Sequence, residues 1–137
     1  MLKRAIMISL IATVLITVKA EAAQISEEER DLIATCIEAE AGNQPIYGKK
    51  LVAAVILNRV EDEAFPDTVE EVISQPGQFS TYKNGAMDKA VTSPEDYEAV
   101  KLELAERTED VLFFNCGAYQ PWGKPWKKVG DHYFNVR

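Results

Sequence analysis

The sequence predicts a single α+β domain that is rich in helix and has a small β element, and three observations predict it. Ser26 and Glu29 form a capping box, the side-chain pattern that begins a helix. Residues 48–60 are apolar almost all round, which is typical of a helix in the centre of a core. Residues 111–114 and 132–134 are short apolar runs that are typical of buried strands.

The remaining predicted elements follow from start and stop signals along the chain. The first helix runs from the capping box to about Ala41 and ends at Gly42-Asn43. After the second helix, Asp67 can cap a short third helix over residues 68–74. Residues 78–92 are polar and aromatic and contain a turn signal, so they predict a small hairpin.

A fourth helix is predicted from Ser93-Pro94 to about Arg107, because proline at the first helical position loses no hydrogen bond. Its apolar side is expected to bury three side chains, those of Tyr97, Val100 and Leu104. Residues 118–130 separate the two predicted strands. This segment is aromatic and rich in glycine and proline, and we predict that it forms a loop.

The N-terminus has the pattern of an export signal. A short basic region precedes an uncharged apolar run over residues 5–18, and Ala20-Glu21-Ala22 matches an A-x-A cleavage site. The apolar run is shorter than the roughly 20 residues that a membrane-spanning helix needs. We therefore predict a signal peptide over residues 1–22 and a secreted or wall-associated domain over residues 23–137, without stable membrane association. An uncleaved N-terminal anchor is the alternative.

Composition argues against several classes of function. The net charge of −7 does not suit nucleic-acid binding, which depends on basic side chains that neutralise phosphates. The chain has one histidine and no spacing typical of a metal site, so we expect neither a metal nor a cofactor. We also expect a monomer. Cys36 and Cys116 can pair in an oxidising compartment, but Cys36 equally suits a buried apolar position. The sequence therefore does not decide whether the two form a disulfide.

Glu40 is the most informative residue of the sequence. Helical periodicity places it on the same face as Ile33 and Ile37, in the middle of an apolar stripe, whereas Glu38 falls on the opposite, solvated face. A buried carboxylate is costly when ionised, so it either finds a partner or holds a proton. A protonated glutamate is the acid that cleavage of a glycosidic bond needs. The structural alternatives are rotation toward water at the helix end, or pairing with Arg59.

Asn58 also faces inward by periodicity, with the apolar stripe of the second helix. A buried asparagine needs hydrogen-bond partners, which are usually backbone groups. We therefore expect a structural role for Asn58 rather than a contact with a substrate.

An ordered series of segments resembles the SleB-type cell-wall hydrolases, which include the spore-cortex-lytic enzymes of germination. The resemblance covers about residues 29–135. Its segments are Glu40-Ala41-Gly42-Asn43-Gln44-Pro45, Gly48, residues 52–60 (VAAVILNRV), Phe65-Pro66-Asp67-Thr68, Val72-Ile73, Gln78-Phe79-Ser80 and Gly130-Asp131-His132-Tyr133-Phe134. In two respects the chain departs from the pattern: many members have a second glutamate where this sequence has Gln44, and many carry a separate wall-binding domain.

The resemblance implies a lysozyme-like fold, akin to goose-type lysozyme and lytic transglycosylases, and Glu40 matches the catalytic glutamate of the family. It implies cleavage of peptidoglycan glycan strands between N-acetylmuramic acid and N-acetylglucosamine, with 1,6-anhydromuramyl ends as products. Hydrolysis at the same bond, an inactive glycan-binding domain and a muramyl-peptide amidase stay open as rival functions. Whether the substrate is vegetative wall or spore cortex also stays open.

Six side chains are candidates for binding the sugar, because amides and hydroxyls bond sugar substituents and aromatic faces pack on sugar rings. Phe79 suits the core equally well, and the pair at 132–133 suits a strand end equally well. Trp122 and Trp126 can grip glycan or cover the core. The six candidates are Gln78, Phe79, Ser80, Tyr82, His132 and Tyr133.

Overall fold

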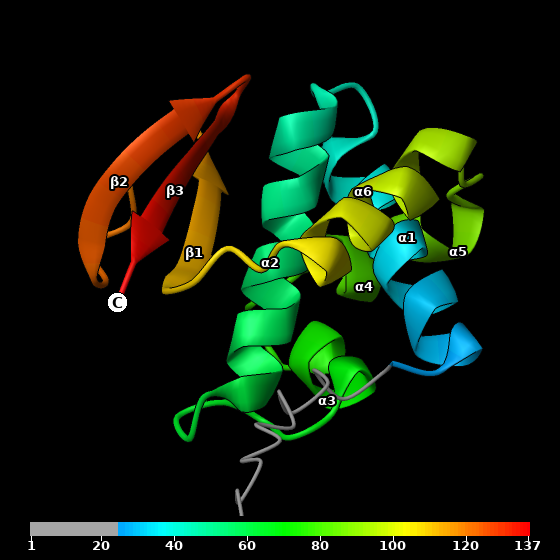
Figure 1. The fold of residues 1–137 in the computed structure, drawn as a ribbon, viewed down its shortest axis with the longest axis horizontal. Coiled ribbons are helices and arrows are strands. Elements are labelled where there is room, and N and C mark those ends of the chain that lie inside the picture. Colours follow the sequence, from blue (N-terminus) through cyan, green and yellow to red (C-terminus); the bar gives the residue numbers. More distant parts are fainter. Residues whose placement is uncertain (1–24) are drawn as a thin grey trace, which may run out of the picture.

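The computed structural model describes residues 25–137, and the predicted signal peptide over residues 1–22 lies outside the described residues. The described part of the chain forms six helices followed by a three-stranded sheet (Figure 1). The predicted α+β class is thereby confirmed. None of the described helices combines the length and the apolar character that crossing a membrane requires.

Helix α2 (Ile46–Glu61) is the centre of the core, and it lies between the sheet and the other helices (Figure 1). Seven consecutive residues, from Leu51 to Leu57, are buried, as the apolar sequence predicts. Helix α1 (Glu27–Ala41) packs beside it and begins at the predicted capping box. There the Ser26 amide donates to Oε2 of Glu29 over 2.8 Å.

The segment after α2 differs from its prediction in two places. Helix α3 (Val69–Ser74) is capped by Thr68 rather than Asp67, because the threonine hydroxyl accepts from the amide of Glu71. Residues 78–92 form two short helices, α4 (Ser80–Lys83) and α5 (Ala86–Lys89), in place of the predicted hairpin. Both helices pack on α1, and this tertiary contact outweighs the local turn signal.

Helix α6 (Pro94–Ala105) starts at Ser93-Pro94 as predicted, but its inner face is partly charged. Val100 is buried, whereas Tyr97 and Leu104 are only half-buried. Asp96 and Glu103 are fully buried instead, because they pair with lysines of α2. Those partners, Lys49 and Lys50, lie 2.9 and 2.8 Å from the two carboxylates.

The sheet has the order β1-β3-β2 and is antiparallel throughout, with strands β1 (Val111–Cys116), β2 (Lys124–Val129) and β3 (His132–Val136). Strand β2 falls within residues 118–130, so the prediction of a continuous loop there is wrong. Its lysines and proline give it no apolar alternation, and only pairing with β3 defines it as a strand. As an edge strand, β2 tolerates these residues.

Two polar expectations about the core have clear outcomes. Asn58 donates to the carbonyls of Thr108 and Val111 over 2.8 and 2.9 Å, which confirms its structural role. Glu38 is half-buried rather than fully solvated, because α6 covers that side of α1. The carboxylate of Asp96 raises the pKa of Glu38, and burial raises it further.

The two cysteines are free in the structure. Cys36 is buried in the helical core, whereas Cys116 is exposed at the end of β1. Burial raises the pKa of the Cys36 thiol well above its usual range, which suits the apolar role considered for it.

Candidate functional site

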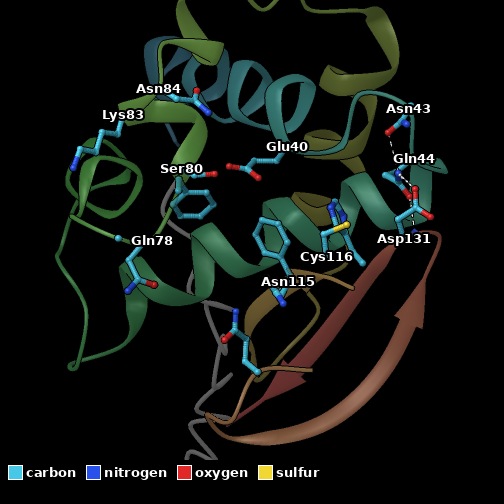
Figure 2. A pocket seen from close by; sticks show the side chains of 15 residues that line it. Glu40, Asn43, Gln44, Gln78, Ser80, Lys83, Asn84, Asn115, Cys116 and Asp131 are labelled. Atoms are coloured by element: carbon cyan, nitrogen blue, oxygen red, sulfur yellow. Dashed lines mark hydrogen bonds between the residues drawn. The ribbon is translucent and has the colours of Figure 1, made fainter. Parts of the chain in front are cut away.

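A cleft of about 940 Å³ lies between the helices and the sheet. Figure 2 shows Gln78 and Lys83 at one end, Asn43, Gln44 and Asp131 at the other, and Glu40 between them. Its lining is mostly amide, hydroxyl and charged side chains, which suits a polar substrate such as a sugar polymer. The lining residues are Glu40, Asn43, Gln44, Gly77, Gln78, Phe79, Ser80, Lys83, Asn84, Phe114, Asn115, Cys116, Gln120, Asp131 and His132.

Glu40 occupies the last turn of α1, and its carboxylate points into the cleft toward Ser80 (Figure 2). Its side chain is half-buried. Oε1 accepts a hydrogen bond of 2.6 Å from the hydroxyl of Thr81, a buried residue of α4. The carboxylate has therefore found a partner, as its position in the apolar stripe requires, but that partner is a neutral hydroxyl.

Arg59 does not pair with Glu40, although the sequence left that pairing open. It is 4% exposed and donates from Nε to the carbonyl of Leu112 over 2.8 Å. Its guanidinium carbon lies 4.9 Å from the centre of the Phe65 ring and 5.5 Å from that of Phe79. Burial lowers the pKa of Arg59 to about 10, so the group is still charged at neutral pH.

Gln78 is oriented by Arg59. Nη1 of the guanidinium donates to Oε1 of Gln78 over 3.0 Å. Because guanidinium nitrogens only donate, the amide oxygen must face Arg59, and the amide nitrogen is left for the cleft. Gln78 therefore presents hydrogen-bond donors to whatever binds there.

His132 lines the cleft at the start of β3 and is 5% exposed. Its ring meets the edge of Phe114 with 5.2 Å between ring centres. Burial lowers the pKa of His132, while the nearby charges of Glu40 and Asp131 act in the opposite direction. Nδ1 is buried without a hydrogen-bond partner among the described residues, so the neutral ring best carries its proton on Nε2.

Gln44 and Asp131 join the helical wall of the cleft to the sheet. Gln44 Nε2 donates to Oδ2 of Asp131 over 2.9 Å, and the Asp131 amide donates to Oε1 of Gln44 over 2.8 Å. The neighbouring Gly130 has φ +56°, and a Cβ there would collide with the Gln44 amide. Gln44 replaces the second glutamate that the resemblance leads one to expect, and its neutral amide can donate to the Asp131 carboxylate.

The structure brings most of the predicted sugar-binding residues into the cleft with Glu40. Gln78, Phe79, Ser80 and His132 line it. Tyr82 lies outside the lining and is 47% exposed, because α4 is a helix and turns this side chain away from Thr81. Tyr133 lies outside it because neighbouring strand residues point to opposite faces, and its ring packs against Tyr119 at 5.0 Å.

Phe79 belongs to the core as well as to the cleft. It is only 3% exposed and packs against Phe114, with ring centres 5.9 Å apart. Its edge can contact a substrate, but most of its ring is covered.

Sequence reasoning missed two residues that act on the candidate groups: Thr81, which bonds Glu40 from outside the cleft lining, and Asp131, which lines the cleft. Thr81 stands between two named candidates, and a hairpin prediction gave no reason to select it. Asp131 directly precedes His132, but a turn residue with no periodic pattern carries no signal of what it faces. In residues 25–137, no three His, Cys, Asp or Glu side chains are grouped so that they could hold a metal ion.

Comparison with known proteins gives a family match. The model of the cell wall hydrolase family matches residues 43–135. A spore cortex-lytic enzyme of Bacillus cereus is 31% identical over 117 residues, which cover 80% of this chain and 44% of that protein. The corresponding enzyme of Bacillus subtilis is 32% identical over 115 residues, covering 80% of this chain and 38% of that one. The chain thus spans less than half the length of these relatives.

Two solved structures resemble the fold. The catalytic domain of the Bacillus cereus SleB protein superimposes with a TM-score of 0.72 and 28% identity, covering 82% of this chain and 93% of that one. The catalytic domain of the germination-specific lytic transglycosylase SleB from Bacillus anthracis gives a TM-score of 0.71 and 28% identity, covering 82% of this chain and 98% of that one.

Proposed function

Because the chain belongs to the cell wall hydrolase family, we propose that it is a peptidoglycan-degrading enzyme and that it cuts the glycan strand between N-acetylmuramic acid and N-acetylglucosamine, with Glu40 as general acid and base. The observation that carries this proposal is the Glu40 carboxylate, which points into a polar cleft and is held by Thr81. Its place of action is the cell wall, reached by export through residues 1–22, and it acts as a monomer without a cofactor.

The chemical step needs one carboxylate. Protonated Glu40 gives its proton to the glycosidic oxygen, and the bond from that oxygen to C1 of the muramic acid breaks. The C6 hydroxyl of the same sugar then forms a bond to C1, while the Glu40 carboxylate takes the hydroxyl proton. The product has a 1,6-anhydromuramyl end and Glu40 is protonated again. An intramolecular nucleophile supplies the attack that a second carboxylate or a water would otherwise provide.

The neighbours of Glu40 suit the binding of N-acetylated sugars. Gln78 offers amide donors and His132 offers Nε2–H, and both can bond the carbonyl oxygen of an N-acetyl group. The hydroxyl of Ser80 can either donate or accept, and it faces Glu40 (Figure 2). These three side chains therefore supply hydrogen-bond partners for the N-acetyl and hydroxyl groups of sugars bound next to Glu40.

Asp131 is the group on which a hydrolytic mechanism would rest, because it is the other carboxylate among the cleft residues. A hydrolase with two carboxylates needs one of them free to activate water. One oxygen of Asp131 is engaged by Gln44, which favours a structural role. Transglycosylation by Glu40 alone is therefore the proposal that the geometry supports best.

Mass spectrometry of the fragments released from purified peptidoglycan tests the proposal. The mature protein is compared with Glu40→Gln, with Asp131→Asn, and with the matched control Glu38→Gln on the same helix. We expect anhydromuramyl fragments from the wild type, the control and Asp131→Asn, and none from Glu40→Gln. Reducing muramic acid ends that vanish in both Glu40→Gln and Asp131→Asn would replace the proposal with two-carboxylate hydrolysis.

The same fragments test the role of Glu40, an amidase activity and the type of wall that is cut. Cleavage that survives Glu40→Gln would remove Glu40 from the mechanism, and loss of activity with a chelator would indicate an amidase. Vegetative sacculi and spore cortex are offered side by side, because the named relatives are spore cortex-lytic enzymes. Release from cortex alone would extend the proposal to spore germination.

A further inference from the structure

Exposed aromatic and basic side chains gather on and beside the edge strand of the sheet. Tyr47, Tyr119, Trp122 and Trp126 are each between 37% and 59% exposed. Strand β2, the outer strand in Figure 1, contributes three lysines. We call this set, completed by Tyr133, the sheet surface, and it wraps around the edge of the sheet, because Lys127 pairs with the core residue Phe134 whereas Lys128 pairs with Tyr133 on the opposite face. Its members are Tyr47, Tyr119, Trp122, Lys124, Trp126, Lys127, Lys128 and Tyr133.

The lysines of the sheet surface keep their charge available. Within residues 25–137, Lys124, Lys127 and Lys128 form no ion pair, whereas Lys49 and Lys50 of α2 are paired with carboxylates. Two of the three lie against aromatic rings instead. Lys127 Nζ is 4.1 Å from the centre of the Trp126 ring, and Lys128 Nζ is 5.2 Å from that of Tyr133. In a protein of net charge −7, this is a local concentration of unneutralised positive charge.

The loop that carries part of this surface is held in place from beneath. Asn135 of β3 is fully buried, and its Nδ2 donates to the carbonyls of Gln120 and Trp122 over 2.9 and 2.8 Å. Gly123 has φ +61°, and a Cβ there would collide with the Val136 carbonyl. Because both amide hydrogens of buried Asn135 bond to this loop, the backbone of the loop is held in one conformation. The loop therefore loses less entropy when it binds a ligand.

The sheet surface also begins where the cleft ends. Lys127 pairs with Phe134, which points to the same side of the sheet as His132 of the cleft, whereas Tyr133 and Lys128 lie on the opposite face. At the edge, Tyr47 lies in the first turn of α2, three residues after Gln44, and its hydroxyl accepts a hydrogen bond of 3.1 Å from Lys127 Nζ. A polymer longer than the cleft meets these residues as it leaves the site.

We propose that the sheet surface binds peptidoglycan outside the cleft, with sugar rings on its aromatic side chains and stem-peptide carboxylates on its lysines. The inference rests on the proposed function for its substrate. Peptidoglycan combines the two chemistries that the surface presents, because carbohydrate rings alternate with acidic peptides along the strand. The surface keeps the enzyme on an insoluble polymer between cuts, which compensates for the repulsion between an acidic protein and an acidic wall.

Co-sedimentation with purified sacculi at 4 °C tests this binding, with every variant built in the Glu40→Gln background. The sheet variant replaces Lys124, Lys127 and Lys128 with glutamine. Its matched control replaces three exposed basic residues elsewhere, Arg30, Lys89 and Lys101, and so has the same net charge. We expect the sheet variant to bind about tenfold more weakly, the effect of losing three solvent-exposed ion pairs, and the control to bind like the parent. Trp126→Ala is a second variant that leaves the charge unchanged, and it should also weaken binding.

Treated sacculi identify the ligand. Converting the stem-peptide carboxylates to amides should weaken binding of the parent protein by the same factor. It should also abolish the difference in binding between the sheet variant and its control. Equal loss in the two triple variants would overturn the proposal, as would unchanged binding in both. Loss of binding only after removal of other anionic wall polymers would assign the lysines to those polymers instead. Sheet variants that bind normally but self-associate would show that the lysines only guard the edge strand.

The binding assay needs no turnover, so it separates this inference from the catalytic proposal. Normal binding with a Glu40→Gln protein that still cuts the wall would overturn the role of Glu40 and leave the sheet surface standing. Loss of cleavage in Glu40→Gln with equal binding by sheet variant and control would overturn the role of the sheet surface and leave the role of Glu40 standing.

Discussion

The hydroxyl of Thr81 donates a hydrogen bond of 2.6 Å to Oε1 of Glu40, across the gap between the end of α1 and the short helix α4. Thr81 is itself buried, so the bond is shielded from water. It fixes the plane of the carboxylate, so that the other oxygen is the one available to a substrate. The acid of the proposed reaction is thus oriented by a residue from a separate element.

Replacing Thr81 with valine, which has the same shape, should lower kcat about tenfold. The variant loses the hydrogen bond that orients the Glu40 carboxylate, and the free energy of such a bond corresponds to at least a tenfold change in rate. KM should change little, since Thr81 does not line the cleft. Turbidity loss of sacculi and steady-state kinetics on soluble glycan fragments measure the two constants. Thr81→Ser restores the hydroxyl and should restore kcat, and a serine variant as slow as the valine variant would show that the methyl packing matters instead.

Gln78→Glu tests whether the Gln78 amide serves as a donor. The variant keeps an oxygen for Arg59 but replaces the amide nitrogen with a second oxygen, so the cleft loses its donors. We expect KM to rise about tenfold, the effect of one lost hydrogen bond and a new repulsion with an acceptor oxygen. The melting temperature should not fall, because Arg59 gains a charged partner. An unchanged KM would remove Gln78 from substrate binding.

The stability of the fold should fall between pH 7 and pH 5 because of His132. In the unfolded chain the imidazole titrates near 6.5, whereas burial lowers its pKa in the folded protein. As the pH falls through 6.5 toward the folded pKa, the unfolded state takes up more protons, and the free energy of unfolding decreases. Urea unfolding at several pH values measures this decrease.

His132→Phe is the control for that pH dependence, since phenylalanine can pack among the surrounding rings without titrating. Its free energy of unfolding should depend less on pH over the same interval. Glu40 and Asp131, the acidic groups near the ring, remain in both proteins. Parallel curves for the wild type and the variant would show that His132 is not the source.

Asn58→Leu should destabilise the fold by about 3 kcal/mol, because it leaves two carbonyls and one guanidinium without their partner. Asn58 donates to Thr108 and Val111 and accepts from Arg107 over 2.8 Å. Urea unfolding gives the difference, with Asn43→Leu at the exposed end of the cleft as a comparison. A loss below about 0.5 kcal/mol would mean that water replaces these bonds.

The positions of Glu40 and Asn58 were predictable, because helical periodicity is a local property that fixes which residues share a face. The surroundings of Glu38 were not, because α6 is remote in sequence and covers a face that looked solvated. Strand β2 was not predicted either, because it too is defined by a contact with another element. Nothing within its own residues indicates a strand until β3 pairs with it.

Within the site, the sequence pointed to the segment around residues 78–80 but not to the orientation of its side chains. A hairpin would turn alternate residues into the cleft, whereas the observed helix α4 directs Thr81 to Glu40 and leaves Tyr82 exposed. His132 and Tyr133 were named together, yet a strand separates them onto opposite faces. Distinguishing such neighbours requires knowing the element, and both elements are set by tertiary packing.

The bond between Gln44 and Asp131 joins residues that are 87 positions apart. One wall of the cleft is therefore supplied by the first helices and the other by the C-terminal hairpin. A growing or incomplete chain that lacks the hairpin has Glu40 but no closed site around it. The cleft is therefore complete only when strands β2 and β3 have docked against the helices, and a chain truncated before Asp131 would leave Gln44 without its partner and Glu40 without the facing side of the cleft.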